Sequence, residues 1–246
     1  MKRRKICLII ISGIIFAAAA AVAAKAVFER AAGPDIVIDG KRVSKEEYLI
    51  CMKSVEYDTK IQIQQEYGAG YDEKFWTRQY GGSAGYEILA ENTIERLKHI
   101  HAVYDIARQN GDVGDSGYEA IKKRWESENA RRSEKTGSGE VIYGLKEYTF
   151  DLYLQYEMST LKETYCNDQS REGMDLTEEE VLEHYNRRDW IFGEDAEKAD
   201  LDTARIAVER ELREQKYDHI VRQRAENSKV DEDMDSVSEF TLKNIQ

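Results

Sequence analysis

The sequence has little proline, little cysteine and no surplus of positive charge. A single proline, Pro34, stands among 246 residues, and because proline is the strongest helix breaker, its scarcity favours long helices. Three cysteines are too few for a disulfide framework in a chain of this length. The formal net charge is −12. A surface this acidic repels phosphate backbones, so we expect no nucleic-acid partner.

The residue patterns of common catalytic and metal sites are missing as well. His99 and His101 lie two positions apart, which puts them on different sides of a helix, where they cannot converge on one ion. Residues 231–235 imitate the opening of a calcium loop, but Ser236 and Leu242 stand where that loop requires glycine and glutamate. No phosphate-binding loop and no nucleophile elbow occurs. The sequence therefore predicts no catalytic residue, no metal site and no cofactor.

The N-terminal segment has the pattern of an export signal. A basic cluster at residues 2–5 precedes an apolar run at 6–16 and an alanine-rich stretch to Ala24, as in a secretory signal peptide. An uncleaved signal anchor is the alternative, because residues 6–24 carry no charge and are long enough to span a bilayer. In both cases the body lies outside the cytoplasm, either secreted or anchored to the outer face of the cytoplasmic membrane. Residues 25–34 then form a spacer.

Two cysteines remain beyond this segment, Cys51 and Cys166. An oxidising compartment permits a disulfide between them, whereas two buried reduced thiols are the other interpretation. The sequence leaves both open.

A small β-hairpin and a capped helix are expected at the start of the body. Residues 36–38 and 41–43 read as strands, joined by Asp39-Gly40 in a type I′ turn. Ser44 then caps a helix, and Glu47 three residues later completes a capping box.

Helical spacing of apolar residues predicts that most of the remaining chain is helical. A second capping box is expected at Thr177 and Glu180, and Asp200 is expected to cap the last helix. Val230 is assigned to a short strand, and residues 231–246 to an acidic tail. The expected helices cover about residues 44–68, 83–110, 117–132, 145–166, 177–192 and 200–221.

The most distinctive aromatic group lies in the connection at residues 71–82 rather than on a helical stripe. Phe75, Trp76 and Tyr80 are therefore the candidate exposed apolar patch. An equally open interpretation is that they cap the helical core.

The order of these elements resembles the SurA/PrsA-type extracytoplasmic foldases. The motif IDGKRVSKEEY (Ile38 to Tyr48) is similar to the strand, turn and capped helix with which their chaperone domain begins. LTEEEVLEHY (Leu176 to Tyr185) looks like the helix that leads into their parvulin isomerase domain, and AVERELREQKYD (Ala207 to Asp218) like their returning helix. Here, however, only residues 193–199 separate those last two helices, far below the ~40 residues that an independent core needs.

The resemblance implies a mainly α fold: a multi-helix, SurA-N-like chaperone domain over residues 35–230. The part at 35–192 would be completed by a returning helix and strand at 200–230, which pairs with the first hairpin in a small β element. The implied function is an ATP-independent chaperone, not an enzyme, that holds unfolded exported polypeptides, with Phe75, Trp76 and Tyr80 as client contacts. Two alternatives stay open: an interaction or assembly module for a single partner, and a peptidyl-prolyl isomerase with an unrecognised site.

Overall fold

The computed structural model describes residues 33–192 and 197–245. The expected export signal at residues 1–24 and most of the spacer lie outside this range. The chain divides into two compact units: the first comprises the residues up to Thr93 together with those from Val230 onward, and the second comprises Ile94–Lys229. The boundary between the two units lies inside helix α3 (Gly85–Gln109).

The fold is mainly α, as the sequence predicts, with helices α2 to α8 and short antiparallel strands in the described chain. No helix of that part combines the length and the apolar composition needed to cross a membrane.

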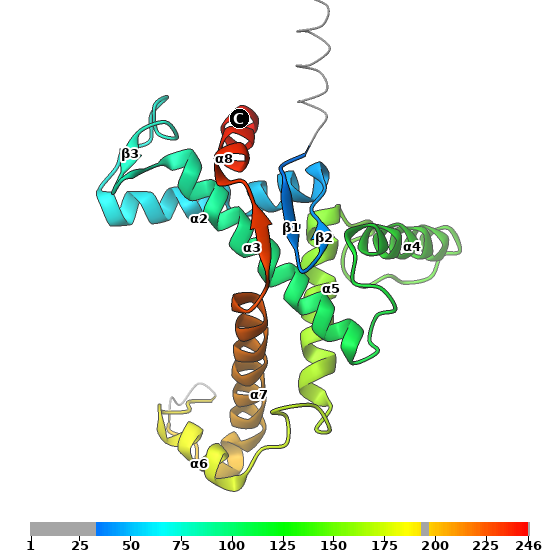
Figure 1. The fold of residues 1–246 in the computed structure, drawn as a ribbon. Coiled ribbons are helices and arrows are strands. Elements are labelled where there is room, and N and C mark those ends of the chain that lie inside the picture. Colours follow the sequence, from blue (N-terminus) through cyan, green and yellow to red (C-terminus); the bar gives the residue numbers. More distant parts are fainter. Residues whose placement is uncertain (1–32, 193–196, 246) are drawn as a thin grey trace, which may run out of the picture. The chain divides into compact units, whose positions relative to one another are not determined.

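A three-stranded sheet joins the two ends of the first unit (Figure 1). Strand β1 (Ile36–Ile38) pairs with β2 (Lys41–Arg42) on one side and with β5 (Val230–Glu232) on the other, both antiparallel. The turn residues Asp39 and Gly40 both have positive φ, 48° and 78°, as a type I′ turn requires. The expected hairpin and its pairing with the strand at Val230 are therefore confirmed.

Helix α2 (Lys45–Tyr67) begins and ends where the sequence predicts. The Ser44 hydroxyl accepts a hydrogen bond from the Glu47 amide at 3.1 Å, and the Glu47 carboxylate accepts one from the Ser44 amide at 3.3 Å. Gly68 ends the helix in the left-handed conformation at φ 64°, which glycine adopts without a steric penalty.

The start of α3 differs from the prediction at Ser83. A small hairpin, β3 (Gln79–Tyr80) and β4 (Ser83–Ala84), precedes the helix, which begins at Gly85. Gly81 and Gly82 have φ of 64° and 111°, so the chain reverses there instead of entering a helix. A side chain at Gly85 would meet the Phe75 carbonyl oxygen at 2.9 Å, which explains the glycine at this close approach.

The expected acidic tail is wrong: residues from Met234 to Asn244 form helix α8. Asp233 caps it, accepting a hydrogen bond from the Ser236 amide at 3.3 Å. Val237, Phe240 and Thr241 are buried. These three lie at helical spacing on one face. So few residues, next to an acidic run, are a weak sign of a helix in the sequence.

In the second unit, α4 (Tyr118–Gly137) and α5 (Phe150–Asn167) differ in length from the prediction. Helix α4 runs five residues past Arg132, where the sequence predicts its end. Helix α5 begins five residues after Leu145, because side chains of α4 bind the carbonyl groups of Leu145 and Tyr148 and so hold that segment outside the helix.

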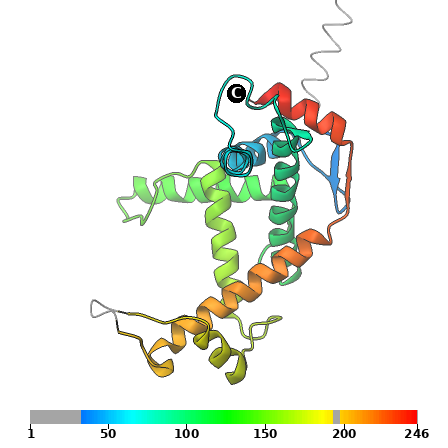
Figure 2. The ribbon, with the colours of Figure 1, turned by 90° about the vertical axis from the view of Figure 1, so that its left-hand side faces the viewer.

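The second unit also contains α6 (Glu178–Asn186) and α7 (Leu201–Glu226), which lie side by side (Figures 1 and 2). Both predicted caps are confirmed. Thr177 and Glu180 form a capping box, and Asp200 accepts a hydrogen bond from the Thr203 amide at 2.8 Å. Helix α6 is shorter than predicted, ending at Asn186 rather than near Trp190.

The two body cysteines lie in different units. Cys51 is in α2 and Cys166 in α5, and both are buried and not joined in a disulfide. The structure thus agrees with two buried reduced thiols.

Candidate functional site

The aromatic group singled out in the sequence is not an exposed patch. Phe75, Trp76 and Tyr80 are all buried in the first unit. The Phe75 ring lies edge-on to Trp76 at 5.1 Å and 5.7 Å from Tyr80, and the Tyr80 hydroxyl donates to the Phe75 carbonyl at 3.0 Å. The β3–β4 hairpin turns the connection back on itself and directs these rings inward. The exposure expected for them is wrong, and their burial agrees with the other interpretation, in which they pack toward the interior.

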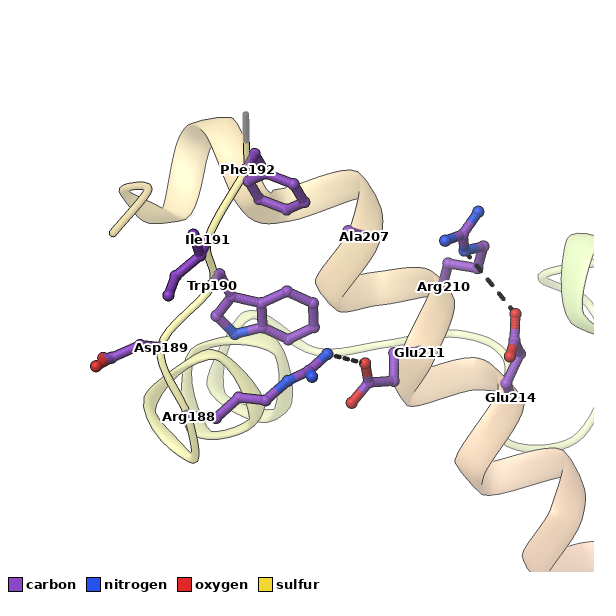
Figure 3. A pocket seen from close by; sticks show the side chains of 9 residues that line it. All are labelled: Arg188, Asp189, Trp190, Ile191, Phe192, Ala207, Arg210, Glu211 and Glu214. Atoms are coloured by element: carbon purple, nitrogen blue, oxygen red, sulfur yellow. Dashed lines mark hydrogen bonds and ion pairs between the residues drawn. The ribbon is translucent and has the colours of Figure 1, made fainter. Parts of the chain in front are cut away.

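An exposed apolar surface lies instead in the second unit, around α6 and α7. There the chain after α6 and the N-terminal half of α7 enclose a cleft of about 440 Å³. Apolar and charged side chains line it together: Trp190, Ile191 and Phe192 come from the segment after α6, and Arg210, Glu211 and Glu214 from α7 (Figure 3). Its lining residues are Arg188, Asp189, Trp190, Ile191, Phe192, Ala207, Arg210, Glu211 and Glu214.

The apolar part of the lining centres on Trp190. Its ring is buried against Val181 of α6 and against Ala204 and Val208 of α7. The Trp190 indole N–H donates to the carbonyl of Tyr185 at 3.1 Å. These contacts anchor the segment after α6 and leave the next two side chains, Ile191 and Phe192, exposed at the mouth of the cleft.

The same segment closes on itself just before α7. The backbone of Ile191 pairs antiparallel with that of Lys198, and the Ala199 amide donates to the Trp190 carbonyl at 2.8 Å. Lys198 also pairs with Asp189 at 2.9 Å, and this carboxylate holds the pKa of Lys198 above its ordinary value. Within this stretch, residues 193–196 lie outside the described chain.

The charged side chains of the cleft are paired with one another or with neighbouring side chains. The Arg188 guanidinium lies over the Trp190 ring at 4.2 Å and pairs with Glu211. His184 Nε2 approaches the same Glu211 carboxylate at 3.2 Å, and Arg210 pairs with Glu214 at 3.9 Å. Paired charges around an apolar wall suit contact with a polypeptide, whose side chains and amide groups offer both kinds of partner.

Within residues 33–192 and 197–245, no three His, Cys, Asp or Glu side chains converge as metal ligands would. The cleft lining holds no serine, cysteine or histidine beside a base.

The sequence does not predict this cleft, because helical spacing assigns Trp190 to Phe192 to the end of the helix expected at 177–192. The signal that was available is that three consecutive apolar residues cannot all face the core from one helix. At least one of them must then be exposed or belong to another element.

No family model matches the chain. A protein of Bifidobacterium longum subsp. longum described as a chaperone for lacto-N-biosidase is 33% identical over 209 residues, which is 85% of this chain and 75% of the relative. Among solved structures, the GH136 lacto-N-biosidase of Eubacterium ramulus aligns with 60% of this chain and 29% of its own, at 16% identity and a TM-score of 0.47. A likeness of that size supports no conclusion about fold or function.

Proposed function

The chain belongs to the family of the chaperone for lacto-N-biosidase, and on that premise we propose that it is a chaperone dedicated to one exported enzyme. The client we propose is a glycoside hydrolase of the lacto-N-biosidase kind. The observation that carries the proposal is the 33% identity over 85% of the chain. Similarity of that extent is not confined to one motif or one element.

This proposal replaces the unfolded exported polypeptides expected from the sequence with a single client enzyme. A general holdase for unfolded exported chains needs a broad apolar cradle, and the aromatic residues expected to line it, Phe75, Trp76 and Tyr80, are buried. The exposed apolar side chains of the second unit form small, well-anchored surfaces such as the cleft at Trp190. Small fixed surfaces favour one partner over many, because promiscuous binders rely on surfaces that can repack.

The proposed place of action is outside the cytoplasm, because residues 1–24 have the composition of an export signal. The proposed mode of action is binding alone, without nucleotide, since the sequence has no phosphate-binding loop. The chaperone would hold its client until the client's own apolar surface is buried.

Co-expression tests the proposal. The full chain is expressed with a lacto-N-biosidase encoded in the same genome and, separately, with the Bifidobacterium longum lacto-N-biosidase. We expect soluble, active enzyme to rise severalfold only when this chain is present. An unrelated exported hydrolase serves as the control and should not respond. Equal yield of every enzyme with and without the chain would refute the proposal.

A general holdase is the second candidate, favoured by the β1–β5 pairing that the SurA/PrsA resemblance implies. It predicts that the purified protein slows aggregation of several unrelated unfolded clients at near-stoichiometric ratios. Under either function we propose no isomerase activity, so X-Pro exchange should stay at its uncatalysed rate of roughly tens to hundreds of seconds.

A further inference from the structure

The loop between α4 and α5, residues 138–149, presents apolar side chains to solvent. Tyr143 is 87% exposed and Val141 75%, and Leu145 beside them is also exposed. Single exposed apolar residues are common on protein surfaces, but three within five positions of one loop are not explained by packing.

The base of this loop is held by a buried arginine. Arg132 of α4 is 6% exposed, and its guanidinium donates to the carbonyls of Leu145 at 2.6 Å and Tyr143 at 3.3 Å. The same group pairs with Glu128 at 2.8 Å and lies 4.5 Å from the centre of the Tyr148 ring. Burying a guanidinium is costly unless its donors are satisfied, and here two of its partners are backbone groups of the presenting segment.

A second set of contacts fixes the end of the loop at Tyr148. Asn129 donates to the Tyr148 carbonyl and accepts from the Tyr148 amide, both at 2.9 Å. The Trp125 indole N–H donates to the same carbonyl at 2.7 Å. The loop is therefore ordered before any partner arrives, so little conformational entropy is lost on binding.

The tip of the loop has no unpaired charge. Glu140, the one charged residue between Ser138 and Leu145, is paired with Lys135 at 3.5 Å. Beyond the tip, the Tyr148 ring stacks at 5.1 Å on Tyr156 of α5, which is also exposed and extends the apolar surface. A surface of this composition complements an uncharged apolar surface.

We propose that loop 138–149 is a docking surface that inserts Tyr143 and Val141 into an apolar depression on an already folded part of the client enzyme. The inference rests on the proposed dedicated function. A preorganised loop whose exposed tip is apolar, and whose one tip charge at Glu140 is paired, fits a concave folded surface. An unfolded client segment could adapt to any exposed apolar site, so it would not require a docking loop that is held in one conformation.

The test compares two variants in the full chain, co-expressed with the lacto-N-biosidase that the wild type rescues. V141S/Y143S removes the apolar tip. Y57S removes a comparably exposed tyrosine, 69% exposed on α2, and is the matched control. Exposed aromatic anchors commonly dominate an interface, so V141S/Y143S should raise the chaperone level needed for half-maximal enzyme recovery about tenfold or more. Y57S should leave it unchanged, and both variants should keep the wild-type thermal midpoint.

The outcomes separate this inference from the function it rests on. Rescue by V141S/Y143S equal to wild type would overturn the docking surface and leave the dedicated chaperone intact. No rescue by the wild type would overturn the function and the docking surface together. If the tip variant instead loses only self-association, measured by light scattering, or only protection of unrelated unfolded clients, the loop serves a different occupant and the proposal is wrong.

Discussion

The hydroxyl groups of Tyr48 and Thr241 lie 2.5 Å apart, although 193 positions separate the two residues in the sequence. Both side chains are fully buried, and the Phe240 ring packs edge-on against the Tyr48 ring at 5.5 Å. Helix α8 therefore packs against α2 and belongs to the core of the first unit.

Replacing Phe240 by alanine should destabilise the protein strongly. The ring is buried against Tyr48, and removing a buried phenylalanine leaves a cavity that typically costs about 3–5 kcal/mol. Leu242→Ala on the same helix is the control, because Leu242 is exposed and should cost less than about 1 kcal/mol. Urea unfolding of both variants measures the difference. Equal losses would mean that α8 does not pack on α2.

Tyr48 should make the protein less stable at alkaline pH. Burial raises the pKa of Tyr48 from 10.0 to about 12, so the folded state keeps the phenol proton over a range in which the unfolded state loses it. The stabilisation from this group is present below pH 10 and is lost as the pH rises through about 12. The shift corresponds to a loss of roughly 3 kcal/mol.

The variant Tyr48→Phe isolates this effect. Phenylalanine cannot ionise, so the unfolding free energy of the variant should fall less steeply between pH 10 and 12 than that of the wild type. At neutral pH the variant should be about 1 kcal/mol less stable, because the hydrogen bond to Thr241 is lost. If the unfolding free energies of the two proteins fall in parallel as the pH rises, ionisation of Tyr48 does not cause the loss of stability at alkaline pH.

The cleft between the segment after α6 and the N-terminal half of α7 should contribute to client recovery. I191S/F192S replaces the two exposed apolar side chains at its mouth while Trp190 keeps the local core. Recovery of the lacto-N-biosidase should fall severalfold with little change in thermal midpoint. Ile206→Ser is the matched control, because Ile206 is 85% exposed on α7 and does not line the cleft. A decrease of the same size in both variants would argue against the cleft.

The two body thiols should react with a thiol reagent only after unfolding. Burial raises the pKa of Cys166 to about 11, so at pH 8 it is almost entirely in the less reactive thiol form. Cys51 is shielded by its burial in α2. Labelling with a chromogenic disulfide reagent at pH 8 should be slow for the native protein and rapid in denaturant. The absence of reaction even in denaturant would indicate that the thiols are joined.

The turn at the first hairpin and the N-terminal caps of three helices could be predicted from the sequence alone. The turn at Asp39-Gly40, the capping boxes at Ser44 and Thr177 and the cap at Asp200 all lie where the sequence predicts. Each depends on backbone conformation and hydrogen bonds within about four residues, so neighbouring side chains are sufficient to specify it.

Tertiary structure decided which apolar residues face the interior. Phe75 is buried because a hairpin of later residues turns it inward, and Phe240 is buried because Tyr48, far away in sequence, provides its packing surface. Trp190 lies beyond the end of α6 and packs on α7. Arg132 donates a hydrogen bond to the carbonyl of Leu145 and so keeps the loop before α5 out of the helix. Burial depends on partners supplied by distant segments, whereas capping and turn conformation depend on the nearest residues. The helices were therefore largely predictable, and the surfaces proposed to bind the client were not.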